Sequence, residues 1–126
     1  MKIELDTHPS NRNIIESYST AGIIINNVLY ENSIIVCPDQ PVQDWSPHSL
    51  TDLDADQFLR IFELAPELIL LGTGKRLQFP DQHIFASIMT RQIGIEVMDT
   101  AAACRAYNYT AGEGRRVVAA MLSLQS

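Results

Sequence analysis

Two glycines and two cations directly follow a solid apolar run in the segment GTGKR, residues 72–76, and their types and spacing suit them to chemistry. A glycine-rich turn can aim backbone N–H groups at an anion, and the cations would supply counter-charge. Neither nucleotide-binding pattern is present. Ile69 and Arg76 stand where a phosphate loop needs a glycine and a hydroxyl, and Leu77 replaces the third glycine of a dinucleotide loop. Two interpretations stay open, a small-anion site and a tight glycine turn.

Further polar residues would belong to the same site, because ligands of open α/β proteins usually bind beyond the carboxyl ends of the strands. Asp99 follows a second predicted strand, although a carboxylate that caps the next helix offsets the positive helix end and weakens an anion site. The predicted ligand or partner site consists of Gly72, Thr73, Gly74, Lys75, Arg76, Asp99, Arg105, Asn108 and Arg115.

Other familiar chemistries find little support in the sequence. His8, His48 and His83 lack metal-ligand spacing. Cys37 and Cys104 form no CxxC pair, so we expect both to be reduced, with no zinc or redox site. Cys104 is either a nucleophile or a small buried hydrophobe, and the alanines around it favour packing. No catalytic residue, metal or cofactor is predicted.

Arg115 and Trp45 each have a structural and a functional interpretation. Arg115 falls at the edge of an apolar stripe in the predicted last helix, where a half-buried guanidinium needs a carboxylate such as Glu113 or Asp99. That pair would be a structural ion pair or would orient a ligand. Trp45, in a proline-rich loop, would close one end of the core or anchor a partner protein.

Length and composition indicate one domain spanning residues 1–126. The longest apolar runs are far shorter than the roughly 20 residues of a membrane-spanning helix, and the start has no export leader, so we expect a cytoplasmic protein. The formal net charge of −6 argues against a nucleic-acid binder. The formal net charge is −8 over residues 1–70 and +2 over residues 71–126. This uneven distribution favours self-association or a charged partner. Alternatively, the charged side chains only keep exposed faces solvated.

The spacing of apolar residues along the chain predicts the strands and helices that would position these residues. Residues 14–38 are rich in β-branched and aromatic side chains and predict an antiparallel β-meander, with Asn26-Asn27 as a hairpin turn. Thr51 and Asp54 resemble a helix-capping start, and that helix ends before Pro66. The apolar run ELILL predicts a strand buried on both faces.

The second half begins with the pattern strand, helix, strand, which predicts a right-handed βαβ unit with parallel strands. Asp81 would cap its helix. The residues expected to face inward are Ile84, Phe85, Ile88 and Met89. Residues 100–124 read as helical, with a break expected near residues 108–114 and an apolar stripe from Val117 to Leu124. The prediction is an α/β fold in which helices cover the sheet.

The segments LGTG (residues 71–74) and MDTAAACRAYNYTAGEGRRVVAAML (residues 98–122) resemble a family of small α/β domains of unknown function. That family includes a mitochondrial respiratory complex I assembly factor and the adipogenesis-associated domain protein of animals. The positions that carry the resemblance are Asp99-Thr100, Ala103-Cys104, Tyr107-Asn108, Glu113-Gly114-Arg115, Trp45 and Pro66-Glu67. The resemblance covers nearly the whole chain and implies a three-layer α/β/α fold with a mixed central sheet, but no reaction. Thr110 and Gly112 depart from the family pattern, which leaves the helix break near Asn108 open.

Two functions from different classes follow. The first is a non-enzymatic protein-interaction or assembly-factor-like domain with an unidentified protein partner. The alternative is a small-anion or small-molecule binding protein or enzyme that uses residues 72–76. A homodimer is compatible with both. The missing catalytic constellation, the uneven charge and the family resemblance favour the first.

Overall fold

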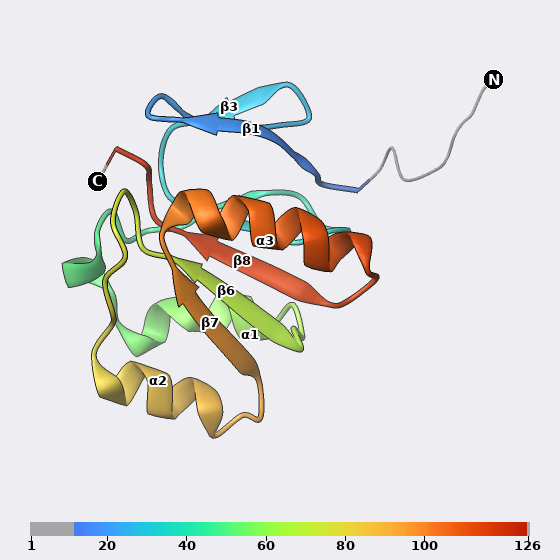
Figure 1. Ribbon diagram of the computed structural model, residues 1–126. Helices are drawn as coiled ribbons and strands as arrows, with labels where there is room; N and C mark the ends of the chain where they lie inside the picture. The colour runs from blue at the N-terminus through green and yellow to red at the C-terminus, as the bar shows by residue number, and fades with distance from the viewer. Residues whose placement is uncertain (1–11, 126) are drawn as a thin grey trace.

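The computed structural model describes residues 12–125, which form two β-sheets and the helices around them (Figure 1). A small antiparallel sheet contains β1 (Ile15–Ser19), β2 (Gly22–Ile25) and β3 (Val28–Tyr30) in that order. The central sheet has the strand order β5-β4-β8-β6-β7. Its strands are β4 (Ile34–Val36), β5 (Gln43–Asp44), β6 (Leu68–Gly72), β7 (Gly94–Met98) and β8 (Val117–Met121). The helices are the 3-10 helices η2 (Leu50–Asp52) and η3 (Ala55–Phe58), with α1 (Leu59–Phe62), α2 (Gln82–Met89) and α3 (Thr100–Gly112).

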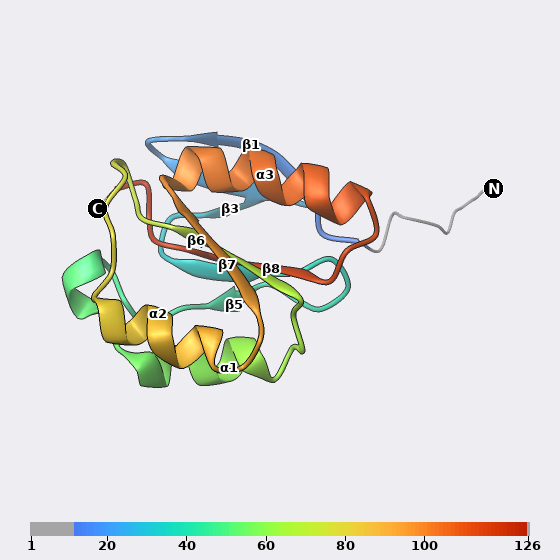
Figure 2. The same cartoon turned by 60° about the horizontal axis from the view of Figure 1, so that its bottom comes forward.

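Three layers are visible when the molecule is seen along the sheet (Figure 2). α3 and the small sheet lie on one face of the central sheet, whereas α1 and α2 lie on the other. β6 runs parallel to both β7 and β8, and β4 runs antiparallel to β8, so the sheet is mixed. The predicted α/β class, the three-layer α/β/α arrangement and the parallel βαβ unit are confirmed.

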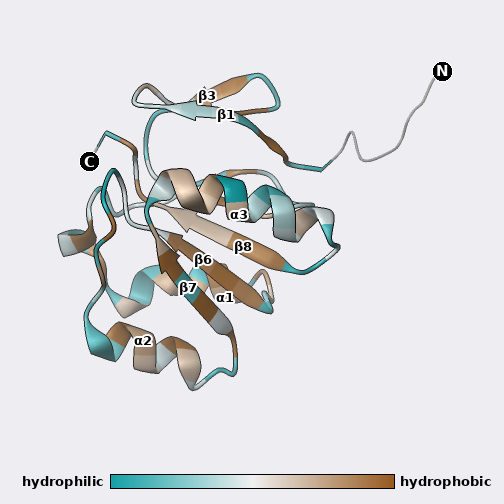
Figure 3. Cartoon of the chain, viewed as in Figure 1, coloured by the Kyte–Doolittle hydropathy of each residue, from teal (hydrophilic) through white to brown (hydrophobic). Residues whose placement is uncertain are grey.

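β8, at the centre of the central sheet, and its neighbour β6 are buried along their whole length. Figure 3 shows that the residues of both strands are mainly hydrophobic. Because successive side chains of a strand point to opposite faces, Leu70 enters the core under α3 while Ile69 enters the core above α1 and α2. Tyr107 and Ile88 are fully buried members of these two cores. The strand predicted from ELILL is therefore confirmed, including its burial on both faces.

The small sheet confirms most of the predicted meander. Asn26 and Asn27 have φ values of 51° and 67°, the left-handed region that asparagine tolerates, and Ile25 pairs with Val28 across the turn. The meander does not extend to β4, which pairs with β8 instead. All three residues of β4 are buried, and a strand without a polar face needs a sheet that is covered on both sides.

Two predicted helices differ from expectation: α1 is short, and α2 buries a narrower face than predicted. Asp54 and Gln57 form the capping box of η3, and α1 ends at Phe62, before Pro66. In α2, Ile84 and Ile88 are buried as predicted, but Met89 is 63% exposed and Phe85 is only half-buried. Because α2 packs against β7 at the edge of the sheet, only a narrow face of this helix is buried.

The predicted helix through residues 117–124 is wrong. α3 ends at Gly112, Gly114 takes a φ of 82°, and residues 117–121 form β8 in the middle of the sheet. A left-handed glycine commonly ends a helix. Val117 and Val118 are β-branched, and the whole run is apolar, which fits a strand buried on both faces better than a helix.

Candidate functional site

The glycine loop follows β6 at the carboxyl end of the parallel strands, as predicted. Gly72 is the last residue of β6, and a Cβ atom there would lie 2.9 Å from Thr100 Oγ1 and 3.2 Å from the Cβ of Ala103. Gly74 has a φ of 96°. The first glycine therefore lets α3 approach the sheet, and the second allows the backbone to turn.

Two backbone N–H groups of this turn, those of Thr73 and Gly74, are used inside the protein. Thr73 donates its backbone N–H to the Met98 carbonyl at 2.9 Å, and Gly74 donates to Thr100 Oγ1 at 2.8 Å. The buried Thr100 hydroxyl donates in turn to the Leu122 carbonyl at 2.7 Å. An anion cradle needs free N–H groups, so the hydrogen bonds favour the tight-turn interpretation.

Beyond the turn, the chain presents cations and apolar side chains to solvent. Lys75 and Arg76 are exposed, and neither forms an ion pair with a residue in the range 12–125. Leu77 is 53% exposed and Phe79 is 66% exposed. A small pocket of about 220 Å³ lies between the start of this segment and η2. The segment is open to a partner, unlike the turn before it.

Asp99 lies beside the loop and caps α3, as predicted. Its carboxylate accepts the Ala102 N–H at 2.8 Å, and the next residue, Thr100, donates its own N–H to the Gly74 carbonyl at 2.9 Å. A carboxylate therefore occupies this helix end, which makes it unfavourable for a second anion.

Arg105 and Asn108 face the small sheet instead of the loop. Asn108 holds β1 through both backbone groups of Ile15, accepting its N–H at 2.9 Å and donating to its carbonyl at 2.8 Å. Arg105 donates to the Tyr18 hydroxyl at 2.6 Å, and its guanidinium carbon lies 6.0 Å from the Tyr18 ring centroid. These two residues attach the small sheet to α3.

Arg115 lies at the opposite end of β6 from the loop. Its Nε is 3.5 Å from Glu67 Oε2, so the predicted partners Glu113 and Asp99 are wrong. The error follows from the strand β8: it starts beside Glu67, just before β6, and carries Arg115 away from Asp99. The backbone N–H of Arg116 donates to Glu67 Oε1 at 3.0 Å, and this bond, with the charge of Arg115, lowers the pKa of Glu67.

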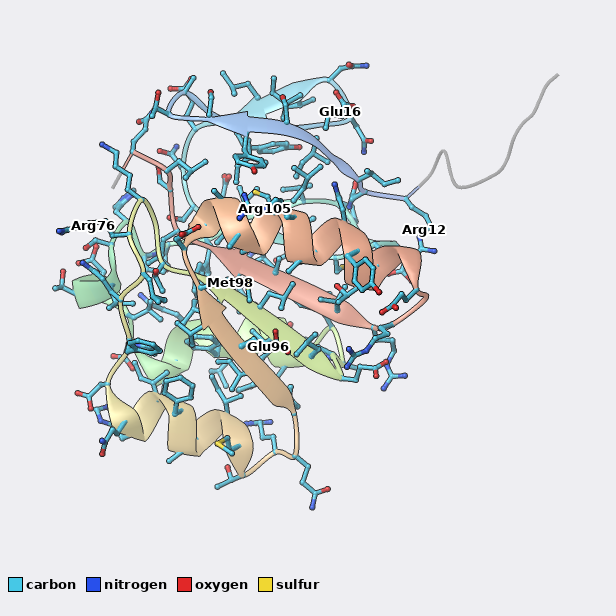
Figure 4. All side chains as sticks on the ribbon, viewed as in Figure 1. Arg12, Glu16, Arg76, Glu96, Met98 and Arg105 are labelled. Carbon is cyan, nitrogen blue, oxygen red and sulfur yellow. The ribbon has the colours of Figure 1, made fainter. Side chains whose placement is uncertain are left out.

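Sequence reasoning missed a pocket of about 430 Å³ at this amino end of β6. Its polar and charged lining includes Arg12, Cys37, Asp39, Glu63, Arg115 and Arg116. Figure 4 shows Arg12 and Arg76 on opposite sides of the molecule, which separates this pocket from the glycine loop. The adjacent pair Arg115-Arg116 after Gly114 is the local sequence signal that could have indicated this pocket.

The remaining candidates have structural roles. Cys104 is buried, and burial raises the pKa of its thiol to about 12, so the packing interpretation holds. Trp45 is 3% exposed, and its ring N–H donates to the Gln57 carbonyl at 3.0 Å, so it closes the core. Among residues 12–125, no cluster of His, Cys, Asp and Glu side chains could hold a metal ion; His8 lies outside that range. None of the helices described is long and apolar enough to cross a membrane.

Comparison with known protein families adds an independent line of evidence. The family described as "Protein of unknown function (DUF498/DUF598)" matches residues 15–122. The bovine protein named NADH dehydrogenase (ubiquinone) 1 alpha subcomplex assembly factor 3 is 32% identical over 110 residues, which cover 86% of this chain and 59% of that protein. The human protein of the same name is also 32% identical over 110 residues, with the same coverage. The chain thus spans less than two thirds of these relatives.

Solved structures show the same fold. A crystal structure of a Bordetella parapertussis protein has a TM-score of 0.84 at 34% identity, covering 89% of this chain and 96% of that one. An NMR structure of a Xanthomonas campestris protein has a TM-score of 0.83 at 38% identity, covering 95% and 91%. A Bordetella pertussis protein described as a Mth938-like domain has a TM-score of 0.81 at 28% identity, covering 98% and 93%.

Proposed function

This chain belongs to the DUF498/DUF598 family, and we propose that it is a non-enzymatic protein-interaction domain that serves the assembly of a larger protein complex. The observation that carries this proposal is the 32% identity, over 86% of the chain, to proteins named as assembly factors. Those names refer to NADH dehydrogenase, whereas the complex served by this chain is left open. A cytoplasmic location and a homodimer are compatible with this role and remain predictions.

The exposed segment after the glycine turn is the partner surface that we propose. Leu77 and Phe79 are large apolar side chains left more than half exposed, and Lys75 and Arg76 beside them are unpaired among residues 12–125. Aromatic and apolar anchors surrounded by charge are typical of interface centres. The partner would carry an apolar pocket with acidic side chains at its edge.

The alternative function, a small-anion or small-molecule site in residues 72–76, gains no support from the hydrogen bonds. The N–H groups of Thr73 and Gly74 donate within the protein, and Asp99 already occupies the neighbouring helix end. We therefore propose that the cations of this loop, Lys75 and Arg76, contact the protein partner.

Site-specific photocrosslinking in the organism's own cells tests the proposed function. A photoreactive phenylalanine analogue would replace Phe79, which is 66% exposed, and Tyr109, which is 70% exposed on α3, in two matched variants. We expect the variant at position 79 to crosslink reproducibly to one protein and the variant at position 109 to leave that protein unlabelled. Equal labelling at both positions, or none at position 79, would count against this surface.

A further inference from the structure

The pocket at the amino end of β6 is built from parts of the chain that are far apart in sequence. Residues 37–40 follow β4, residues 63–64 follow α1, residues 114–116 precede β8, and Arg12 joins them from the segment before β1. Its volume of about 430 Å³ falls within the range of roughly 300–1,000 Å³ that is usual for small-molecule sites. The proposed partner surface at residues 75–79 uses none of these residues.

Two of the arginines contact a neighbouring residue through their inner nitrogen. Arg116 Nε donates to the Ala65 carbonyl at 3.1 Å, and Arg115 Nε lies 3.5 Å from Glu67 Oε2. The terminal guanidinium nitrogens of both residues make no hydrogen bond to residues 12–125. The outer donors of both guanidinium groups therefore stay available to a ligand.

Arg12 supplies a third guanidinium. One of its terminal nitrogens donates to the Ala111 carbonyl at 3.2 Å, close to the carboxyl end of α3, where a cation is favoured by the helix dipole. Its remaining donors are not used by any residue in the range 12–125. Three arginines thus line one pocket, and a guanidinium fork matches two oxygens of a carboxylate or phosphate.

Two carboxylates and an apolar base complete the lining. Asp39 and Glu63 also line the pocket, and neither forms an ion pair with a described cation, whereas Glu67, which is outside the lining, pairs with Arg115. Carboxylates accept hydrogen bonds from hydroxyl groups. Cys37 and Val118 are buried, and burial raises the pKa of the Cys37 thiol, which keeps that residue neutral.

We infer that this pocket binds a small molecule through an oxyanion, a carboxylate or phosphate group, on a carrier that has hydroxyl groups. The arginines would hold the oxyanion, and Asp39 and Glu63 would accept hydrogen bonds from the hydroxyls. This inference does not depend on the proposed assembly role, since it concerns the opposite end of the central sheet.

Isothermal titration calorimetry on the full chain tests the inference with three probes: inorganic phosphate, glucose 6-phosphate and malate. We expect saturable binding of at least one hydroxylated probe, tighter than that of inorganic phosphate. Preference between glucose 6-phosphate and malate separates a phosphate from a carboxylate ligand. Arg12→Gln and Arg115→Gln should each weaken binding about tenfold or more, because each removes a charged donor.

Arg76→Gln is the matched control, since it removes the same charge at the far end of the molecule. It should leave the dissociation constant unchanged within about twofold, because exposed charges farther apart than the Debye length are screened. Thermal unfolding without ligand would verify that each variant is folded. Absence of saturable binding by all three probes, or equal weakening in Arg76→Gln and Arg12→Gln, would overturn the inference.

Discussion

The two ends of β6 differ in how their polar groups are used. At the carboxyl end, the Gly74 N–H and the Thr100 hydroxyl bond inside the protein, and the turn is closed. At the amino end, Glu67 fixes Arg115 and the backbone of Arg116 but leaves their terminal donors open toward a pocket. Donor groups that have no hydrogen-bond partner within the protein therefore indicate a binding site better than a glycine-rich motif does.

The largest effect is expected at Gly72, where the carboxyl end is packed most closely. Gly72→Val should lower the free energy of unfolding by about 3 kcal/mol, because its Cβ would lie 2.9 Å from Thr100 Oγ1 and 3.0 Å from Thr100 Cα. Urea denaturation measures this loss. Gly112→Ala is the control: nothing lies within 4 Å of its Cβ position, so stability should stay the same or rise by up to about 1 kcal/mol. Equal losses in both variants would show that close packing at Gly72 is not the cause.

Thr100→Val should have the next largest effect. This nearly isosteric change removes the acceptor of the Gly74 N–H and the donor to the Leu122 carbonyl, both buried, and should cost about 2 kcal/mol. The same denaturation experiment on Thr51→Val, which alters an exposed hydroxyl, should show a change below about 0.5 kcal/mol. If Thr100→Val left stability unchanged, the turn would not be closed by this hydroxyl.

The smallest effect on stability, but one with a defined pH dependence, is expected at the amino end. The folded-state pKa of Glu67 lies below its ordinary value of 4.5, so its ionised form contributes stability above pH 4.5, and this contribution is lost as the pH falls through the lowered pKa. Glu67→Gln should therefore be slightly less stable than the native chain at pH 7 and equal to it in strong acid. Thermal unfolding from pH 7 downward measures the difference. A difference that grows toward acid pH would contradict this.

Glu67→Gln should also change ligand binding in the pocket. The ion pair of Arg115 with Glu67 is more than a third exposed and contributes little to folding, yet it places a negative charge beside the arginines. Removing that charge should tighten oxyanion binding severalfold in the calorimetric titration. Weaker binding in Glu67→Gln would show instead that the orientation of Arg115 matters more than its free charge.

Local features were predictable from the sequence. The Asn26-Asn27 turn, the fully apolar strand β6 and the Asp99 cap each depend on a few adjacent residues whose conformational preferences are strong. The last segment was not, because the apolar residues from Val117 to Leu124 fit a helical period as well as a continuous buried run. Only pairing with β4 and β6 decides between them.

The candidate site is less predictable than the fold, because it depends even more on contacts between residues that are distant in sequence. Residues 72–76 and Asp99 do meet at one edge, since parallel strands end together. The helical period of residues 100–124 predicts that Arg115 lies at this edge, whereas the start of β8 brings it beside Glu67 at the other end of β6. The pocket depends on contacts such as Arg12 with Ala111, 99 residues apart, which no local pattern indicates.

Backbone amide NMR during titration with glucose 6-phosphate tests the contrast between the two ends of β6 most directly. The carboxyl end is closed by internal hydrogen bonds, and the amino end is open to a ligand. We predict that the amide resonances of Gly114, Arg115 and Arg116 shift and saturate with one dissociation constant, while those of Thr73 and Gly74 stay in place. Saturable shifts at Thr73 and Gly74 with unchanged resonances at residues 114–116 would contradict the account, because the anion site would then lie at the glycine turn.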